Sequence, residues 1–419
     1  MQSNVIWTVE SVTSLQKLVD SEIESFIMTN NLDAAIINCM NKVFSQSENN
    51  DIKTITYIVA TLKLISLTPK ARKEFGSQVQ ELERLATMLL EKNRIKSGKS
   101  KLSFIYGQIK QAKSAISRND GNTWSALWES SLGLYLSNGS ANPQLPFQHI
   151  NFVVQSINQG YPARSLEIID ELKDSSNSKN INTELSILKS KALKLSGKME
   201  AATNELVDIE DLSKLQDRVK FDYMFLNAVK KGETKELYQS LYGRNAKDWD
   251  YHDGYLICAF WLMAQPSKVH AKLCPTMAII KKKMKSSSRN TRHNNLIKVL
   301  STVLECHDAS TPIVRRIEKV GMVMPIIETL EAEYKLLALA ALLRFFNQRQ
   351  KQFAAIFHAE YTALSNKLSE GQNSDVYKLF PSVKNLDTIS PFYSTLQNDI
   401  EKEQEEYELS EVDSIVLSG

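Results

Sequence analysis

The chain has few residues of the kinds that interrupt regular structure. Its 419 residues include 14 glycines and 10 prolines. A β-sandwich or a β-barrel needs a turn roughly every ten residues, and those turns draw on glycine and proline. The scarcity of both therefore argues against a strand-rich fold and favours an all-α protein.

Cysteines and long apolar runs are also scarce. The four cysteines, Cys39, Cys258, Cys274 and Cys306, lie far apart, which is typical of reduced thiols in a core. No run approaches the ~18 apolar residues that a transmembrane helix requires. The first residues do not show the basic segment and apolar core of a secretory signal. We therefore expect a cytoplasmic protein that has no membrane partner.

Neither sign of charge dominates the chain. Lys and Arg total 51 and Asp and Glu total 48, so the net charge is +3, and hydrophobic residues make up 42%. Such a balance points to no class of partner, because only a local excess of charge can do so. The length exceeds what one compact core supports, so we expect two to three domains or one extended repeat array.

Four glycines near the middle of the chain are almost evenly spaced. Gly121, Gly160, Gly197 and Gly232 follow one another at intervals of 39, 37 and 35 residues. Each follows an amphipathic helical run and precedes another. Glycine suits the residue after a helix because it adopts the left-handed conformation without a Cβ penalty. The spacing predicts helix–turn–helix units stacked side by side.

The segment LKSKALKLSGKMEAATNEL, residues 188–206, resembles the tetratricopeptide repeat (TPR) family. Gly197 matches the glycine between the two helices of that repeat, Ala202 its small residue and Leu206 its large apolar residue. The other units depart from the pattern, with Ser165 and Leu237 where the family prefers alanine. The resemblance implies a right-handed helical-repeat solenoid with a concave binding face, and it transfers no specific binding residues.

The pattern of the chain predicts four parts. Residues 1–100 form an N-terminal helical region, and residues 101–250 form the TPR-like repeats. Residues 251–370 remain helical but lose the period, as in a second bundle. Residues 371–419 form a loop and an acidic tail, with eight acids and one lysine from Asp399 to Asp413. The fold class is thus an all-α solenoid with flanking helical bundles.

No catalytic, cofactor or metal site is predicted. Ser97-Gly98-Lys99-Ser100 resembles the end of a phosphate-binding loop, but Asn93 stands where that motif needs a glycine, and a helix precedes it. His270 with Cys274 and Cys306 with His307 could supply zinc ligands, although neither pair has the usual spacing. We expect a polar interhelical loop at the first place and packed or surface side chains at the second.

Two basic stretches, residues 92–113 and 281–298, each hold seven positive charges and no acid. Such stretches can bind phosphates or an acidic protein surface, and they can equally be solvated helix ends. The candidate anion- or partner-binding residues are Lys96, Lys99, Lys101, Lys281, Lys282, Lys283, Lys285, Arg289 and Arg292.

These observations predict a non-enzymatic scaffold, adaptor or regulatory subunit that holds a partner peptide or helix in a concave groove. The alternative is a nucleic-acid-binding helical protein of the nucleoprotein type, which uses the two basic stretches while the acidic tail competes with the ligand or mediates self-association. An enzyme with a site that the sequence does not reveal is a third, weaker alternative.

Overall fold

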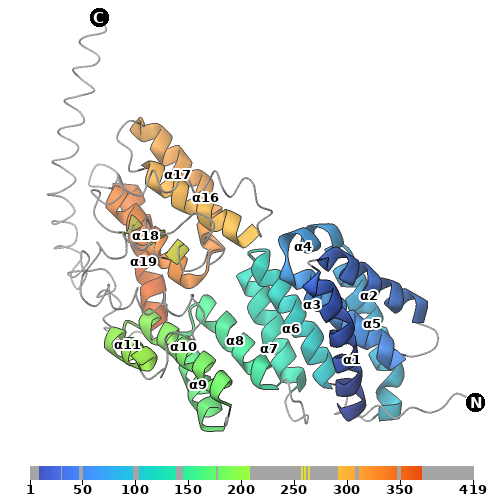
Figure 1. Cartoon of the computed structure of the whole chain (residues 1–419). Helices are drawn as coiled ribbons and strands as arrows, with labels where there is room; N and C mark the ends of the chain where they lie inside the picture. The colour runs from blue at the N-terminus through green and yellow to red at the C-terminus, as the bar shows by residue number, and fades with distance from the viewer. Residues whose placement is uncertain are drawn as a thin grey trace, which may run out of the picture. The chain divides into compact units, whose positions relative to one another are not determined.

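The structure of the protein is a computed structural model, and it describes residues 9–29, 31–46, 51–97, 103–137, 145–175, 178–207, 256–257, 259–260, 263–264, 291–306, 311–346 and 351–369. Every regular element bounded in these ranges is an α-helix, which confirms the all-α prediction (Figure 1). Among the helices of these ranges, none is both long and apolar enough to cross a membrane.

The helices divide into two compact units. Unit 1 comprises residues 1–155 and 287–292, and unit 2 comprises residues 156–286 and 293–419. Unit 1 contains α1 (Val9–Met28), α2 (Leu32–Gln46), α3 (Asp51–Leu67), α4 (Pro69–Phe75), α5 (Gln78–Ser97), α6 (Ser103–Asn119), α7 (Thr123–Ser137) and most of α8 (Leu145–Asn158). Unit 2 contains the end of α8, α9 (Pro162–Ser175), α10 (Lys179–Leu195), α11 (Met199–Val207), nearly all of α16 (Thr291–Cys306), α17 (Ile313–Glu328), α18 (Ala332–Phe345) and α19 (Lys351–Ser369).

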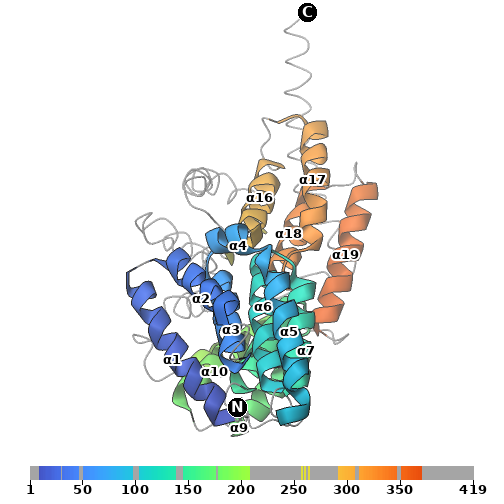
Figure 2. The same cartoon turned by 90° about the vertical axis from the view of Figure 1, so that its right-hand side faces the viewer.

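This division does not follow the boundaries expected near residues 100 and 250. Helices α6 and α7 were expected to open the repeat region, yet they belong to unit 1 because α6 packs against α3. Figure 2 shows α3, α5, α6 and α7 side by side. The first predicted helical hairpin is therefore part of the N-terminal core.

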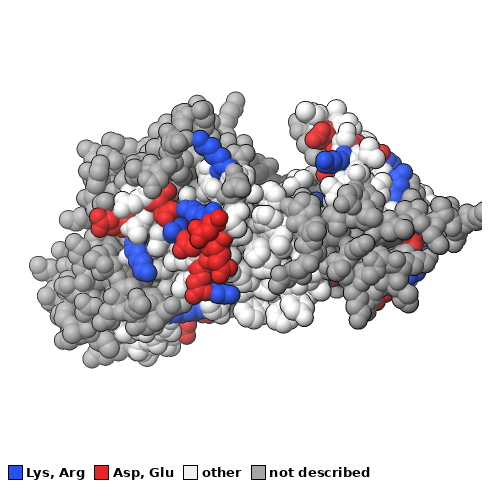
Figure 3. Space-filling view, turned by 90° about the horizontal axis from the view of Figure 1, so that it is seen from below, with Lys and Arg blue, Asp and Glu red and all other residues white. Residues whose placement is uncertain are grey.

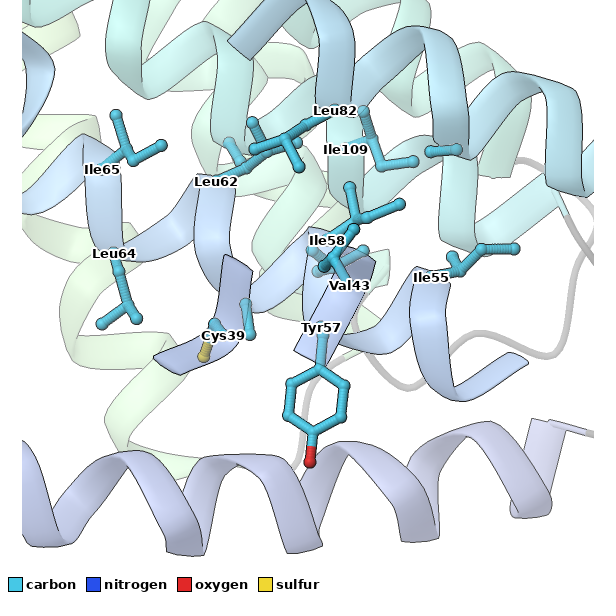
Figure 4. Close-up of a cluster of buried hydrophobic side chains, with 14 of the residues drawn as sticks. Cys39, Val43, Ile55, Tyr57, Ile58, Leu62, Leu64, Ile65, Leu82 and Ile109 are labelled. Atoms are coloured by element: carbon cyan, nitrogen blue, oxygen red, sulfur yellow. The ribbon is translucent and has the colours of Figure 1, made fainter. Parts of the chain in front are cut away.

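Helix α3 is the centre of unit 1. It packs against α1, α2, α4, α5 and α6, and Tyr57, Ile58 and Leu62 are at most 1% exposed. The close-up in Figure 4 shows these side chains among those of the neighbouring helices. The segment is rich in β-branched residues, but it is apolar all round, as expected of a buried helix. The segment is therefore a buried helix, although its β-branched residues would also suit a strand.

The chain between α3 and α5 starts a helix at Thr68 and Pro69, where the sequence has a hydroxyl cap followed by proline. The Thr68 hydroxyl accepts a 3.1 Å hydrogen bond from the Ala71 amide, with Pro69 in the first turn of α4. The apolar pattern of the sequence predicts one helix from Pro69 to about Asn93. The structure has two helices, α4 and α5, which a turn at Gly76 and Ser77 separates.

Three of the four spaced glycines lie in turns of the same geometry. Gly121, Gly160 and Gly197 have φ of 82°, 82° and 78°, in the region that favours glycine. In each turn the glycine amide and the next amide donate to two carbonyls of the preceding helix, with N···O distances of 3.0 and 2.9 Å. This is the Schellman ending of a helix. Gly232 lies outside the described residues.

A side-chain hydrogen bond recurs in two of the hairpins. In α6–α7, the Ser114 hydroxyl donates to the Ala126 carbonyl at 2.8 Å. In α10–α11, the Ser190 hydroxyl donates to the Ala202 carbonyl, also at 2.8 Å. Each serine lies seven residues before its turn glycine and each alanine five residues after it. The bond ties the middle of the first helix to the second.

An ion pair recurs in the same two hairpins. Lys113 lies 2.9 Å from Glu129, and Lys189 lies 3.0 Å from Glu205. Each lysine stands eight residues before the turn glycine and each glutamate eight residues after it. The two hairpins therefore share their turn, one buried hydrogen bond and one ion pair at equivalent positions.

Unit 2 is built around α18, which is apolar and buried along most of its length. It packs against α17 and α19, and α19 also contacts α9. The ring of Phe346, which caps α18, stacks on Phe357 of α19 with centroids 5.0 Å apart. A Cβ placed on Gly160 would lie 3.3 Å from the Cβ of Ala332. The glycine turn between α8 and α9 thus contacts the start of α18 directly.

Candidate protein-interaction surface

Helix α7 carries large aromatic side chains on its exposed face. Trp124 is 60% exposed, Trp128 is 64% exposed and Tyr135 is 77% exposed. Their spacing of four and seven residues places them within about 40° of one another around the helix. We call these three residues the aromatic stripe. Exposed indole and phenol rings in such a row are typical of protein-interaction surfaces.

The opposite face of α7 fixes how the aromatic stripe is presented. Ala126, Leu127, Ser130 and Gly133 are buried toward unit 1. A Cβ on Gly133 would lie 3.2 Å from the Gly107 carbonyl of α6, so this contact requires a close approach of the two helices. Close packing along α6 sets the rotation of α7 about its axis. That rotation directs the tryptophans and Tyr135 to solvent.

Helix α7 and the residues that follow it in the sequence hold almost no charge. Glu129 is the only Asp, Glu, Lys or Arg between Asp120 and Arg164 in the sequence. Its carboxylate lies 3.1 Å from Lys110 and 2.9 Å from Lys113, both on α6. The one acid of α7 is therefore already neutralised on the side of α6. Depletion of charge with enrichment of aromatic residues is the compositional signal of an interface core.

Three of the seven cations in the first predicted basic stretch are paired with acids of neighbouring helices. Lys92 lies 3.2 Å from Asp51. Lys110 and Lys113 each lie 2.6 Å from Glu83 and also pair with Glu129, which closes a ring of four charges. The sequence shows seven cations and no acid here because the acids come from other helices. These three lysines are not available for phosphates without losing those partners.

The charges of this ring alter one another's protonation. Burial alone would raise the pKa of Glu83, but hydrogen bonds from Lys110 and Lys113 hold it below its ordinary value. Burial alone would lower the pKa of Lys113, and its hydrogen bonds to Glu83 and Glu129 raise it instead. Both shifts favour the charged forms of Glu83 and Lys113, and the ring stabilises the α5–α6–α7 packing.

Most of the named candidate cations lie where the structure gives no account of their side chains. Lys96 is in the last turn of α5, and Arg292 is in the first turn of α16. Arg292 is 7% exposed, so its guanidinium is buried and does not present a cation on the surface as predicted. The remaining candidates lie outside the described residues, namely Lys99, Lys101, Lys281, Lys282, Lys283, Lys285 and Arg289. Their binding of an anion stays a prediction.

The charged side chains of unit 2 form mixed clusters. Lys189 bridges Asp170 at 2.9 Å and Glu205 at 3.0 Å, and Lys173 pairs with Glu205 at 2.8 Å. Figure 3 shows acidic and basic side chains intermingled on this part of the surface. The hydrogen bond that Lys189 donates to Asp170 raises the pKa of Lys189. These groups neutralise one another and do not form a surface of one sign.

The remaining chemical candidates find no support among the described residues. Within them, no group of three or more His, Cys, Asp or Glu could hold a metal ion. Cys306, one of the four thiol and imidazole groups considered for zinc, is buried, and its Sγ lies 3.4 Å from the Arg316 carbonyl oxygen. His270, Cys274 and His307 lie outside the described residues, as do Gly98 to Ser100 of the phosphate-loop sequence.

The sequence reasoning missed the aromatic stripe. The signal in the sequence is a lack of charge: the residues from Gly121 to Ala163 contain one charged side chain, in a chain that is 24% charged. An amphipathic surface helix should carry charges on its outer face. Helix α7 carries none beside Trp124, Trp128 and Tyr135, so its outer face departs from that pattern.

The comparisons with known proteins give no guide to the partner. No protein family, no curated protein and no solved structure matches the chain.

Proposed function

We propose that the protein is a non-enzymatic interaction scaffold, built from TPR-like helical hairpins, that binds another protein through the aromatic stripe of α7. The observation that carries the proposal is the exposure of Trp124, Trp128 and Tyr135 on one charge-free helix face. Burial of such rings is a dominant source of binding energy in protein interfaces. The absence of cations there disfavours phosphate as the ligand.

The repeated local geometry supports the scaffold part of the proposal. Two hairpins share a left-handed turn glycine, a serine-to-carbonyl hydrogen bond and a lysine–glutamate pair at equivalent positions. Helical-repeat proteins are built from such recurrent hairpins, and they mostly serve as binding surfaces. The concave groove across the repeats stays a prediction from the sequence. The binding surface proposed here is the aromatic stripe, which lies on one helix.

Site-specific photo-crosslinking tests the proposal. A photoreactive benzoylphenylalanine replaces Tyr135, and the same residue replaces Met322 of α17 in a control variant, since Met322 is 70% exposed on another helix. After irradiation in the native cells, a covalent adduct with a defined polypeptide is expected from position 135 and not from position 322. The adduct should disappear when Trp124 and Trp128 are both changed to glutamate.

Two results would contradict the proposal. One is the absence of any adduct from position 135. The other is a set of adducts common to positions 135 and 322, because an adduct that does not depend on the stripe reports only exposure. The glutamate changes should leave the fold intact, since substitutions at exposed positions usually alter stability by no more than ~0.5 kcal/mol.

A further inference from the structure

We propose that the partner on the aromatic stripe is a second copy of this chain, with the two α7 helices packed antiparallel across a two-fold axis. This inference rests on the proposed function and specifies its partner. It differs from self-association through the acidic tail, because the contact is made by a helix of unit 1.

The spacing along α7 favours a helix as the opposing surface. Trp124, Trp128, Ser131 and Tyr135 follow one another at intervals of four, three and four residues. That alternation is the spacing of a helix–helix seam in a coiled coil. The seam is separate from the face of α7 that packs into unit 1, where Ala126, Ser130 and Gly133 are buried. One helix thus carries two apolar seams, of which only one is covered.

The pattern is complementary to itself when the second helix runs in the opposite direction. Residues 124 and 135, and likewise residues 128 and 131, are symmetric about the same midpoint of the helix. Trp124 of one copy then faces Tyr135 of the other, and Trp128 faces Ser131. A large ring opposite a small side chain lets the two helices interdigitate. The Ser131 hydroxyl donates within its own helix, at 2.8 Å to the Leu127 carbonyl, so covering it does not orphan a donor.

Charge suits such a pairing, and the aromatic rings supply part of the area that it needs. In a two-fold contact the same surface of both copies meets, so a charged stripe would place like charges close together. The stripe has none, and Glu129 is held by Lys110 and Lys113. Aromatic rings bury about 150–250 Å² each when covered. At the exposures observed, the three rings of each copy would bury roughly 800 Å² in the pair, about two-thirds of the area of the smallest stable interface. Leu132 and Leu136, which are half-buried beside the rings, would add to this area.

Sedimentation of the full chain tests the inference. The chain has a mass of 47.5 kDa, so a species of twice that mass is expected as the concentration rises from about 1 to about 100 µM, the range suited to an interface of this size. The double variant Trp124→Glu/Trp128→Glu should sediment as a monomer and keep the helical circular dichroism spectrum of the unaltered chain. The control Met322→Glu, on an exposed residue of α17, should remain a dimer.

Cysteine pairing tests the antiparallel register. The double variant Trp124→Cys/Tyr135→Cys should form a disulfide-linked dimer under mild oxidation, because residues 124 and 135 lie at the same level of the pair. Trp124→Cys alone should not, because two copies of residue 124 would stand about 16 Å apart along the axis. The unaltered chain, with its own four cysteines, is oxidised in parallel as the background.

The outcomes separate this inference from the proposed function. A monomeric mass at every concentration overturns the second-copy inference, and a dimer that survives the double glutamate change does the same. Disulfide dimers of Trp124→Cys alone above the background overturn the antiparallel register. If the photo-crosslink from position 135 joins a different polypeptide, the proposed function stands while this inference fails. If position 135 joins nothing, both fail.

Discussion

The ammonium group of Lys194 lies 2.7 Å from the carboxylate of Glu333, in an ion pair whose side chains are 2% and 14% exposed. Lys194 stands in the last turn of α10, and Glu333 stands in the first turn of α18. Each charge therefore also faces the favourable end of its own helix dipole. The pair joins the middle helices to the C-terminal helices within unit 2, across 139 positions of sequence.

Replacing Glu333 with glutamine should strongly destabilise unit 2. The change keeps the shape of the side chain but removes the charge that compensates the buried ammonium of Lys194. Breaking one partner of a buried pair typically lowers the free energy of unfolding by about 3–5 kcal/mol. Chemical denaturation followed by circular dichroism of the full chain measures the loss.

Glu328→Gln is the matched control, because Glu328 pairs with Lys335 at 2.6 Å but its side chain is 49% exposed. Exposed pairs contribute no more than ~1 kcal/mol, so this variant should stay close to the unaltered protein. The double change Lys194→Met/Glu333→Leu should recover most of the stability lost in Glu333→Gln. Equal effects of Glu333→Gln and Glu328→Gln would show that the pair is not buried in solution.

The turn glycines predict opposite effects of the same substitution at two positions. Gly197→Ala should lower the free energy of unfolding by about 1–2 kcal/mol, because φ of 78° forces a Cβ into the left-handed region. Gly321→Ala should raise it by about 0.5–1 kcal/mol, because Gly321 lies inside α17 and a Cβ there meets nothing within 4 Å. Thermal melting of both variants checks the signs, and a stabilising Gly197→Ala would refute the turn geometry.

The helices and their turns could be predicted because their causes are local. Thr68 with Pro69 marks a helix start, and Gly121, Gly160 and Gly197 mark helix ends, through bonds to residues a few positions away. The break at Gly76 was missed because the apolar pattern continues across it. The sequence also did not predict that α6 belongs to unit 1. Its packing against α3 depends on which apolar faces of distant helices meet, and the local pattern does not contain this information.

The basic stretch shows why the site could not be predicted in the same way. Lys110 and Lys113 appear unpaired in sequence, but Glu83 and Glu129 reach them from α5 and α7. Counting charges along the sequence does not reveal ion pairs between residues that only the packing of the helices brings together. The stripe was readable in principle, because a helix without charges on its outer face departs from the usual pattern. Reading it required knowing which face α7 buries.

Cys39 and Cys306 should resist alkylation in the native protein. Burial raises the pKa of the Cys39 thiol to about 11 and that of Cys306 to about 12, so neither forms much of the reactive thiolate near pH 8. Iodoacetamide at pH 8 followed by peptide mass spectrometry should find both unmodified, and should find both modified after denaturation in urea. Rapid native alkylation of Cys39 would mean that the core around α3 opens.

The charge ring around Glu83 should make stability depend on pH at the acid end. The folded-state pKa of Glu83 lies below its ordinary value of 4.5, so between the two values the unfolded chain binds more protons. The stabilisation is therefore complete above about pH 4.5 and is lost as the pH falls through the folded-state pKa. Glu83→Gln should lower the free energy of unfolding at pH 7 by about 2 kcal/mol, in the range for hydrogen bonds to charged groups.

The same variant should flatten the acid limb of the stability profile, because its side chain no longer titrates. Glu81→Gln is the control, since Glu81 is on the same helix and pairs with Arg84 in an exposed, i,i+3 contact. Denaturant unfolding at several values from pH 3 to pH 7 measures both profiles. At alkaline pH, the stabilisation by Lys113 is lost only above its ordinary pKa of 10.5, because the fold raises that pKa. A Glu83→Gln profile parallel to that of the unaltered protein would contradict the ring as a source of pH dependence.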